Sequence, residues 1–537
     1  MVHRNIVFFV RLAVLAFLSV IIPANYAVAA QSPYDWPPAS ARWSSGDEQG
    51  YEAFVQAIAD SNCTTVKSCL AAPANPLAKG DPPGLVFSAD CADLVYMLRA
   101  YYAWKKGLPF GFVTIVEARR SMGEGDLRTT IHGNYPAFRW DVTSQTPGAD
   151  IRTVLQTIRD QVSTGTFRID PRLDRPVQQD FYSPAITREA LRPGSAIYNG
   201  DGHVVILSRI DEQGRIHFLD AHPDMSVTRG IYAGQFDRGD PALGAGFHAW
   251  RPFAVLEGRF AHAVNEQLQT WSLEQYFGPN AARDWRDADF SEKGRNVDFV
   301  EFTRRRLTNG KLVYDLVSEF RVSLGGLCDA FQERARMVEE ADTRNYWRQV
   351  RPGRLEGSTP DEAFIWLAYS TPGRDRRLRS HAQRTMDALT RQLALYAAND
   401  ALVTYTGKAP RTDLQRAFDD ITANCTAAYI NSDRQRVLLT MRDMLVRLPA
   451  LSFDPYHCPE RRWGASGGEL SRCDEDGDKS RWYDAEAPLR GLVSPRLNPA
   501  NPTLDELLQA SAPPWPRPDI EGVIQTAPEK PHKRGKR

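Results

Sequence analysis

The 537-residue sequence predicts an α+β fold in which a cysteine-bearing helix packs on an antiparallel sheet, followed by a mostly α-helical domain and a disordered C-terminal tail. Three observations support this prediction. A helical pattern includes Cys91 in its first turn, and strand patterns separated by glycine turns follow between residues 193 and 222. From about residue 262 to 450, apolar residues recur at spacings of three and four. After Pro513 proline dominates and the periodicity disappears, which is typical of an extended or disordered chain.

The composition is that of a globular protein without a charge bias. Hydrophobic residues make up 42% of the chain and charged residues 25%, as in ordinary globular domains. Lys and Arg together number 66, and Asp and Glu together also number 66, so the formal net charge is zero. No overall electrostatic field favours binding to nucleic acid, and we expect no nucleic-acid partner.

Residues 1–29 have the pattern of a secretory signal peptide. Arg4 and Arg11 precede an apolar run from residue 12 to 22, and Ala27-Val28-Ala29 forms a small-x-small cleavage signal. The run is short for a membrane span, although an uncleaved anchor is the alternative interpretation. We therefore expect a periplasmic or secreted protein with no stable membrane insertion after cleavage.

Four segments follow the predicted signal peptide. Residues 32–260 mix helix and strand patterns and contain every candidate catalytic residue, whereas residues 262–450 are predicted to be mostly helical. Residues 451–512 are rich in Pro, Gly and charged residues, so we expect an irregular region there. Residues 513–537 form the predicted disordered tail.

The cysteines fit an exported protein with disulfides. The chain has seven of them, so at least one thiol is left over if all bonds are intramolecular. Six cysteines allow 15 pairings, and we use proximity in the sequence and placement in segments to choose among these. The favoured pairs are Cys63 with Cys69, Cys328 with Cys425, and Cys458 with Cys473. Cys91 is then the spare thiol, which is either structural or kept free because its chemistry requires a thiolate.

The helix predicted at Cys91 gives this thiol a suitable position for catalysis. Ser88 is a candidate N-cap, apolar residues recur from Leu94 to Tyr102 at helical spacing, and Gly107 ends the pattern. Cys91 then lies in the first turn, where backbone N–H groups and the helix dipole lower the pKa of a thiol. The same N–H groups could form an oxyanion hole.

A predicted set of short strands supplies the other candidate residues. A strand at 195–198 and a glycine turn lead to His203, the first residue of the next strand, although a histidine capping a strand edge is the alternative interpretation. Asp220 and His222 follow on one face of a third strand, because alternate residues point the same way. We predict that Cys91 attacks a carbonyl carbon, that His203 protonates the leaving amine and that Asp220 orients the imidazole ring. His222 remains an alternative to Asp220.

Several motifs resemble those of cysteine hydrolases. Asp90-Cys91-Ala92-Asp93-Leu94-Val95 resembles the nucleophile motif of NlpC-type cell-wall peptidases. The runs 192–198 and 202–207 resemble the Pro-Gly-Asp and Gly-His-Val strands of NlpC and CHAP domains. The same helix is also similar to that of transglutaminase-like proteins, through Leu98-Arg99-Ala100 and Gly107-Leu108-Pro109, and Leu219-Asp220 matches their Leu-Asp pair. These families share a papain-like fold, so the resemblance implies such a domain over residues 32–260.

The resemblance implies an exported cysteine amidohydrolase or peptidase that cleaves peptide amide bonds through an acyl-thioester on Cys91. Peptide or peptidoglycan-like material is the implied substrate. Two alternatives remain open: transglutaminase-like acyl transfer, and a non-catalytic binding or structural protein on the same scaffold. We predict no cofactor and no metal site, because the acidic run at 474–478 lacks EF-hand spacing and His457-Cys458 has no second ligand pair at zinc spacing. The sequence gives no oligomeric state.

Overall fold

The computed structural model describes residues 32–529, except 38–39, 72, 121–125, 129, 144–145, 147–148, 174–176, 201, 234–238, 292–296, 492–500 and 510–514. The predicted signal peptide, residues 1–29, lies outside the described residues. Within the described part, no helix is both long and apolar enough to cross a membrane.

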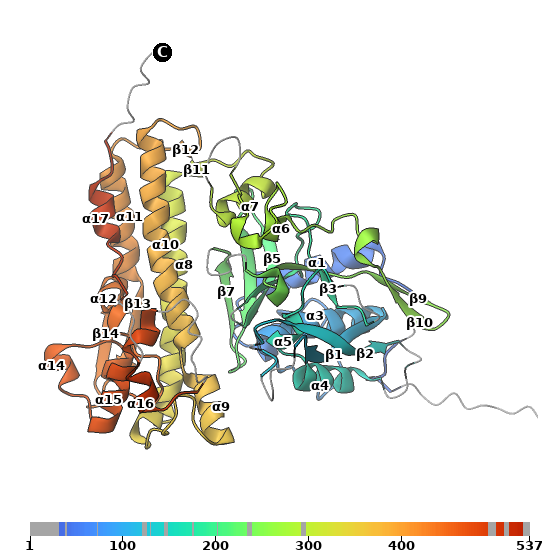
Figure 1. Ribbon diagram of the computed structural model, residues 1–537, viewed down its shortest axis with the longest axis horizontal. Helices are drawn as coiled ribbons and strands as arrows, with labels where there is room; N and C mark the ends of the chain where they lie inside the picture. Colours follow the sequence, from blue (N-terminus) through green and yellow to red (C-terminus); the bar gives the residue numbers. More distant parts are fainter. Residues whose placement is uncertain are drawn as a thin grey trace, which may run out of the picture.

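The N-terminal part of the chain combines helices with antiparallel sheets, as the α+β prediction requires (Figure 1). Its elements, in chain order, are α1 (Ser45–Asp60), α2 (Val66–Leu70), α3 (Cys91–Lys106), β1 (Phe110–Ala118), β2 (Asn134–Val142), α4 (Ile151–Gln161), α5 (Thr164–Phe167), β3 (Phe181–Tyr182), β4 (Ala196–Asn199), β5 (His203–Ile210), β6 (Ile216–Ala221), β7 (Val227–Ile231), β8 (Gly246–Trp250), β9 (Phe253–Leu256) and β10 (Arg259–His262). The main sheet has the strand order β3-β8-β4-β5-β6-β7, and every pair in it is antiparallel. Two hairpins, β1–β2 and β9–β10, stand apart from it.

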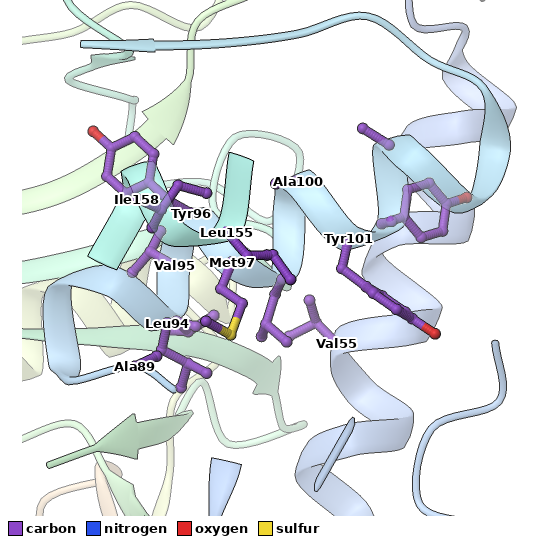
Figure 2. Close-up of a cluster of buried hydrophobic side chains, with 14 of the residues drawn as sticks. Val55, Ala89, Leu94, Val95, Tyr96, Met97, Ala100, Tyr101, Leu155 and Ile158 are labelled. Atoms are coloured by element: carbon purple, nitrogen blue, oxygen red, sulfur yellow. The ribbon is translucent and has the colours of Figure 1, made fainter. Parts of the chain in front are cut away.

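Helix α3 packs on one face of the main sheet, as predicted. Every residue from Cys91 to Trp104 is buried, which is typical of a helix enclosed on all sides. Figure 2 shows its side chains against Val55 of α1 and against Leu155 and Ile158 of α4. Alternate strand residues complete this core, among them Tyr198, Val204, Ile206 and Leu219.

The opposite face of the sheet is covered by a segment that the sequence had assigned to the helical region. Val205 and Leu207 of β5 point to this face and pack with Phe299 and Phe302 of α7 (Phe299–Leu307). The helix α6 (Glu274–Phe277) precedes it. The hydrophobic core therefore changes after α7, later in the chain than the expected boundary at residues 260–262.

The helical region is built around three long helices, α8 (Leu316–Thr343), α10 (Pro372–Ala397) and α11 (Pro410–Asn424), which lie side by side (Figure 1). The remaining elements up to residue 450 are β11 (Tyr314–Asp315), α9 (Pro360–Tyr369), β12 (Val403–Thr404), β13 (Thr426–Ile430), β14 (Arg436–Thr440) and α12 (Met441–Arg447). The β13–β14 hairpin interrupts the region that sequence periodicity predicted to be mostly helical. Helix α8 also contacts β7, the edge strand of the main sheet.

The C-terminal part is more ordered than the composition predicted. The predicted irregular region contains the short helices α13 (Pro459–Arg462), α14 (Gly467–Leu470), α15 (Gly477–Ala485) and α16 (Leu504–Leu507). Residues 515–529 contradict the predicted disordered tail, because α17 (Ile520–Gln525) packs on α10 and α11 through the fully buried Ile520 and Ile524. The surrounding prolines obscured the short apolar pattern of this helix in the sequence. The helix gains its stability from its tertiary partners. Residues 513–514 and 530–537 of the predicted tail lie outside the described residues.

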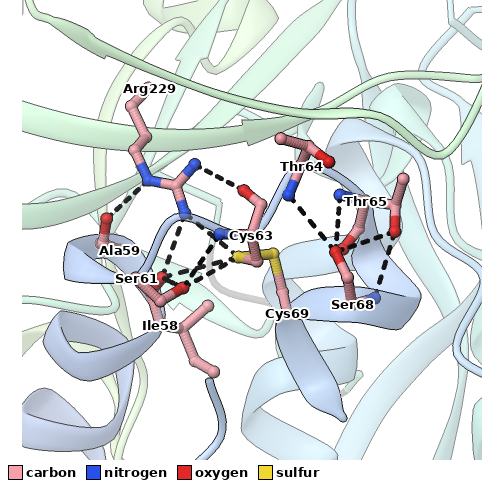
Figure 3. Close-up of a disulfide and its surroundings, with 9 residues drawn as sticks. All are labelled: Ile58, Ala59, Ser61, Cys63, Thr64, Thr65, Ser68, Cys69 and Arg229. Carbon is pink, nitrogen blue, oxygen red and sulfur yellow. Dashed lines mark hydrogen bonds between the residues drawn. A yellow bond between two sulfur atoms is a disulfide. The ribbon is translucent and has the colours of Figure 1, made fainter. Parts of the chain in front are cut away.

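All three predicted disulfides are present, and Cys91 is the free, buried cysteine. The Cys63–Cys69 bond joins the end of α1 to α2, and Arg229 of β7 donates to the carbonyls of Ile58, Ala59 and Cys63 (Figure 3). This contact ties the disulfide to the edge of the main sheet. The Cys328–Cys425 bond joins α8 to the residue that follows α11.

We expect thiol labelling of the exported protein, under denaturing and non-reducing conditions, to modify Cys91 alone. Peptide mass mapping after alkylation would identify the labelled residue, and a reduced sample, in which all seven cysteines react, is the control. Labelling at Cys328 or Cys425 would contradict the bond between α8 and α11.

Candidate active site

Cys91 is the first residue of α3 because Asp90, not the expected Ser88, caps the helix. The Asp90 carboxylate accepts hydrogen bonds from the N–H groups of Ala92, at 2.9 Å, and Asp93, at 3.2 Å. Asp93 completes a capping box by accepting from the Asp90 N–H at 3.4 Å. Two first-turn N–H groups are thereby occupied, which limits any oxyanion role to the N–H of Cys91 itself.

The environment of the Cys91 thiol differs from the sequence expectation. Burial raises its pKa well above the ordinary value, and the nearby carboxylates of Asp90, Asp220 and Asp93 raise it further. A hydrogen bond from the backbone of Val204 acts in the opposite direction. The predicted lowering of the pKa by the helix start is therefore wrong for this structure, because desolvation outweighs the helix dipole. The thiol is protonated at neutral pH.

His203 and Asp220 form the contact that the strand alternation predicted. The antiparallel pairing of β5 with β6, with Ile206 opposite Leu219, brings the start of β5 beside the end of β6. The Nε2 atom of His203 lies 2.8 Å from Oδ2 of Asp220, and their side chains are 14% and 5% exposed. Val204, whose backbone bonds the Cys91 thiol, directly follows His203. All three predicted residues therefore converge on the start of β5.

His222 neighbours this pair and contacts both of its members. Its ring stacks parallel to that of His203, with centroids 6.0 Å apart. Its Nε2 lies 2.9 Å from Oγ1 of Thr228 and 3.6 Å from Oδ2 of Asp220. The hydrogen-bond distance of 2.8 Å between Asp220 and a ring nitrogen of His203 favours Asp220 as the orienting group.

Sequence reasoning missed two acidic residues near the site. Burial, together with the charge of Asp90, raises the pKa of Asp93 to about 9, so this carboxyl is protonated at neutral pH. Its place in the Asp-Cys-Ala-Asp run was the available signal. Glu333 of α8 lies 3.3 Å from Nε2 of His222, and no local pattern could have connected residues so far apart in the chain.

A cavity of about 1230 Å³ adjoins the site between the β6–β7 side of the sheet and helices α7, α8 and α10. His203 and Asp220 line one wall, together with the β7 backbone. Asp329, Glu333 and Arg336 of α8 line the other, one helical turn apart. The cavity is large enough for several residues of a peptide. Cys91 is 9% exposed and is not among the lining residues.

Two groups of potential metal ligands occur among the described residues, both in the C-terminal part. In the first, Cys458 and Cys473 are joined in a disulfide and cannot ligate a metal. The second contains Asp454, which Arg351 contacts at 2.7 Å. It also contains His457, whose two ring nitrogens lie 2.7 Å from Ser452 Oγ and 3.1 Å from the Lys479 carbonyl. In both groups, potential ligand atoms are thus already bonded to other protein atoms.

A scan against protein-family models, a search of curated proteins and a search of solved structures each returned no match. The resemblance to cysteine hydrolases therefore depends on the short motifs and on the arrangement of Cys91, His203 and Asp220.

Proposed function

We propose that the protein is an exported cysteine amidohydrolase or peptidase with a papain-like catalytic arrangement. The observation that carries this proposal is the hydrogen-bonded pair of His203 and Asp220 beside a thiol at the start of a buried helix. A nucleophile, a base and an orienting carboxylate in this order constitute the machinery of acyl transfer.

In the proposed reaction His203 acts as general base toward a neutral thiol. As the sulfur of Cys91 bonds to the carbonyl carbon, its proton passes to Nδ1 of His203, since Asp220 holds Nε2. The tetrahedral intermediate then expels the amine, which takes this proton, and leaves an acyl-thioester on Cys91. Water, deprotonated by His203, hydrolyses the thioester and restores the thiol. The backbone N–H of Cys91 stabilises the oxyanion.

The cavity beside the pair supports a peptide as substrate. Its walls carry both carboxylates and guanidinium groups, which suit a chain bearing both charges. The predicted signal peptide and the three disulfides are compatible with an extracytoplasmic location, where cell-wall peptide is the most accessible polymer of this kind. We propose peptide stems of the cell wall as the substrate class.

A second candidate function is a non-catalytic binding protein on the same scaffold. The burial of Cys91 and its raised pKa favour this alternative, because a structural thiol needs neither exposure nor ionisation. Transglutaminase-like transfer would use the same acyl-thioester and release it to an amine.

The mature protein should be incubated with isolated cell-wall peptide and with a panel of short peptides, with and without added glycine amide. Hydrolysis releases new amino groups, transfer incorporates the amine, and intact mass reports the acyl adduct on Cys91. Absence of all three, with a thiol that does not react with a peptide aldehyde, would overturn the catalytic proposal in favour of the binding protein.

We expect Asp220→Asn to lower kcat/KM by about 10³- to 10⁴-fold, because an amide cannot fix the tautomer that His203 needs. His222→Gln should have a much smaller effect, since Asp220, whose Oδ2 lies 2.8 Å from Nε2 of His203, stays in place in this variant. Steady-state kinetics of both variants measure the difference. Loss of turnover in the His222 variant, with the Asp220 variant still active, would reverse the assignment.

A further inference from the structure

One side chain of the helical region, Glu333, contacts His222 beside the proposed catalytic pair. Oε1 of Glu333, on α8, lies 3.3 Å from Nε2 of His222. Arg374, on α10, donates to the same oxygen at 2.9 Å. Glu333 is 18% exposed and His222 only 2%, so the contact is shielded from solvent. Figure 1 shows α8 beside β7, where this contact forms.

The surroundings of His222 determine which of its nitrogens carries a proton. Three oxygens lie close to Nε2 of His222: Oγ1 of Thr228 at 2.9 Å, Oε1 of Glu333 at 3.3 Å and Oδ2 of Asp220 at 3.6 Å. A lone pair on this nitrogen would face two negative charges, so Nε2 carries the proton. One N–H cannot point straight at all three acceptors. Thr228, Glu333 and Asp220 therefore compete for the same proton, and Asp220 is the most distant of them.

We propose that Glu333 is a positioning residue of the catalytic site, which together with Thr228 keeps the N–H of His222 away from Asp220 and so leaves the Asp220 oxygen to His203. This inference rests on the proposed function. It assigns a role to the helical region, which contacts the site through Glu333 and also forms one wall of the cavity. Arg374 fixes the Glu333 carboxylate in turn.

The charges around the histidines give the sign of the expected change. Asp90 and Asp220 act on His203, Asp220 and Glu333 lie against His222, and Arg374 faces Glu333. Glu333→Gln removes one negative charge, leaves Arg374 uncompensated and weakens one of the two acceptors that compete with Asp220 for the N–H of His222. All three effects weaken the support for a protonated His203 ring.

The test follows the titration of the His203 ring by NMR in full-length mature protein labelled with ¹³C at histidine Cε1, with His203→Gln to assign the signal. Glu333→Gln should move the midpoint to lower pH by about half a unit and lower kcat several-fold. Glu333→Asp should restore most of both. Glu340→Gln, on the same helix but paired with Arg344, is the matched control and should change neither.

Arg374→Gln should move the midpoint in the opposite direction, a result that damage to the fold cannot imitate. Superimposable titrations for wild type, Glu333→Gln and Arg374→Gln would overturn the inference. The NMR readout does not require turnover, so it separates this inference from the proposed function. Turnover that needs Cys91 and His203 but is insensitive to Glu333 would reject only the positioning role.

Discussion

Replacing Cys91 by alanine is expected to lower kcat/KM for amide hydrolysis by at least about 10⁴-fold while the protein stays folded. The proposed reaction has no nucleophile without the sulfur atom, and residual binding interactions do not replace it. The loss of stability should be small, about 1 kcal/mol, because only one buried atom is removed. Turnover of cell-wall peptide and circular dichroism of the variant measure the two quantities.

Cys91→Ser is the matched control for this variant, since it keeps a hydroxyl of nearly the same size in the same place. We expect it to be inactive as well. The raised pKa of the thiol predicts that iodoacetamide reacts slowly with the wild-type protein at pH 7 and faster as the pH rises. Normal turnover by Cys91→Ala would show that the thiol is structural.

Asp375→Asn is expected to destabilise the helical region by about 3–5 kcal/mol, the usual result of leaving a buried charge without its partner. Asp375 on α10 and Arg334 on α8 are both 0% exposed and lie 2.6 Å apart. Arg334 also donates to the carbonyls of Ser452, at 2.9 Å, and Arg462, at 2.8 Å. The ion pair therefore joins two long helices to the C-terminal part of the chain.

Two further arginines increase the cost of losing Asp375. Burial, together with the charge of Arg334, lowers the pKa values of Arg379 and Arg462 to about 10, and the charge of Asp375 opposes this effect. Asn at this position leaves three guanidinium groups with less compensation. Urea unfolding followed by circular dichroism measures the loss.

The control for Asp375→Asn is Asp420→Asn, which removes an exposed partner of Arg321 at 3.4 Å. Exposed pairs contribute between about 0 and 1 kcal/mol, so this midpoint should barely move. Equal midpoints for Asp375→Asn and Asp420→Asn would contradict the structural role of the buried pair.

Local features of the sequence determined the parts of the structure that depend on neighbouring residues. The Cys91 helix was predictable from its apolar spacing and from Gly107, and the short separations Cys63–Cys69 and Cys458–Cys473 pointed to their pairing. His203 and Asp220 were predictable as a pair because adjacent antiparallel strands bring alternate side chains together. The motif resemblance suggested the same three residues but could not test their roles.

Only the tertiary structure decided the properties that depend on burial and on distant contacts. The helix dipole favoured a prediction of a reactive thiolate at Cys91. Burial and the nearby carboxylates instead raise the pKa of this thiol. The sequence around Glu333 does not indicate its contact with His222. The prolines around Ile520 obscured the pattern of a helix that is stabilised by packing on its neighbours. The physical reason is common to all three. Desolvation and tertiary packing depend on which surfaces meet in space, whereas sequence periodicity reports only the surface that each element offers.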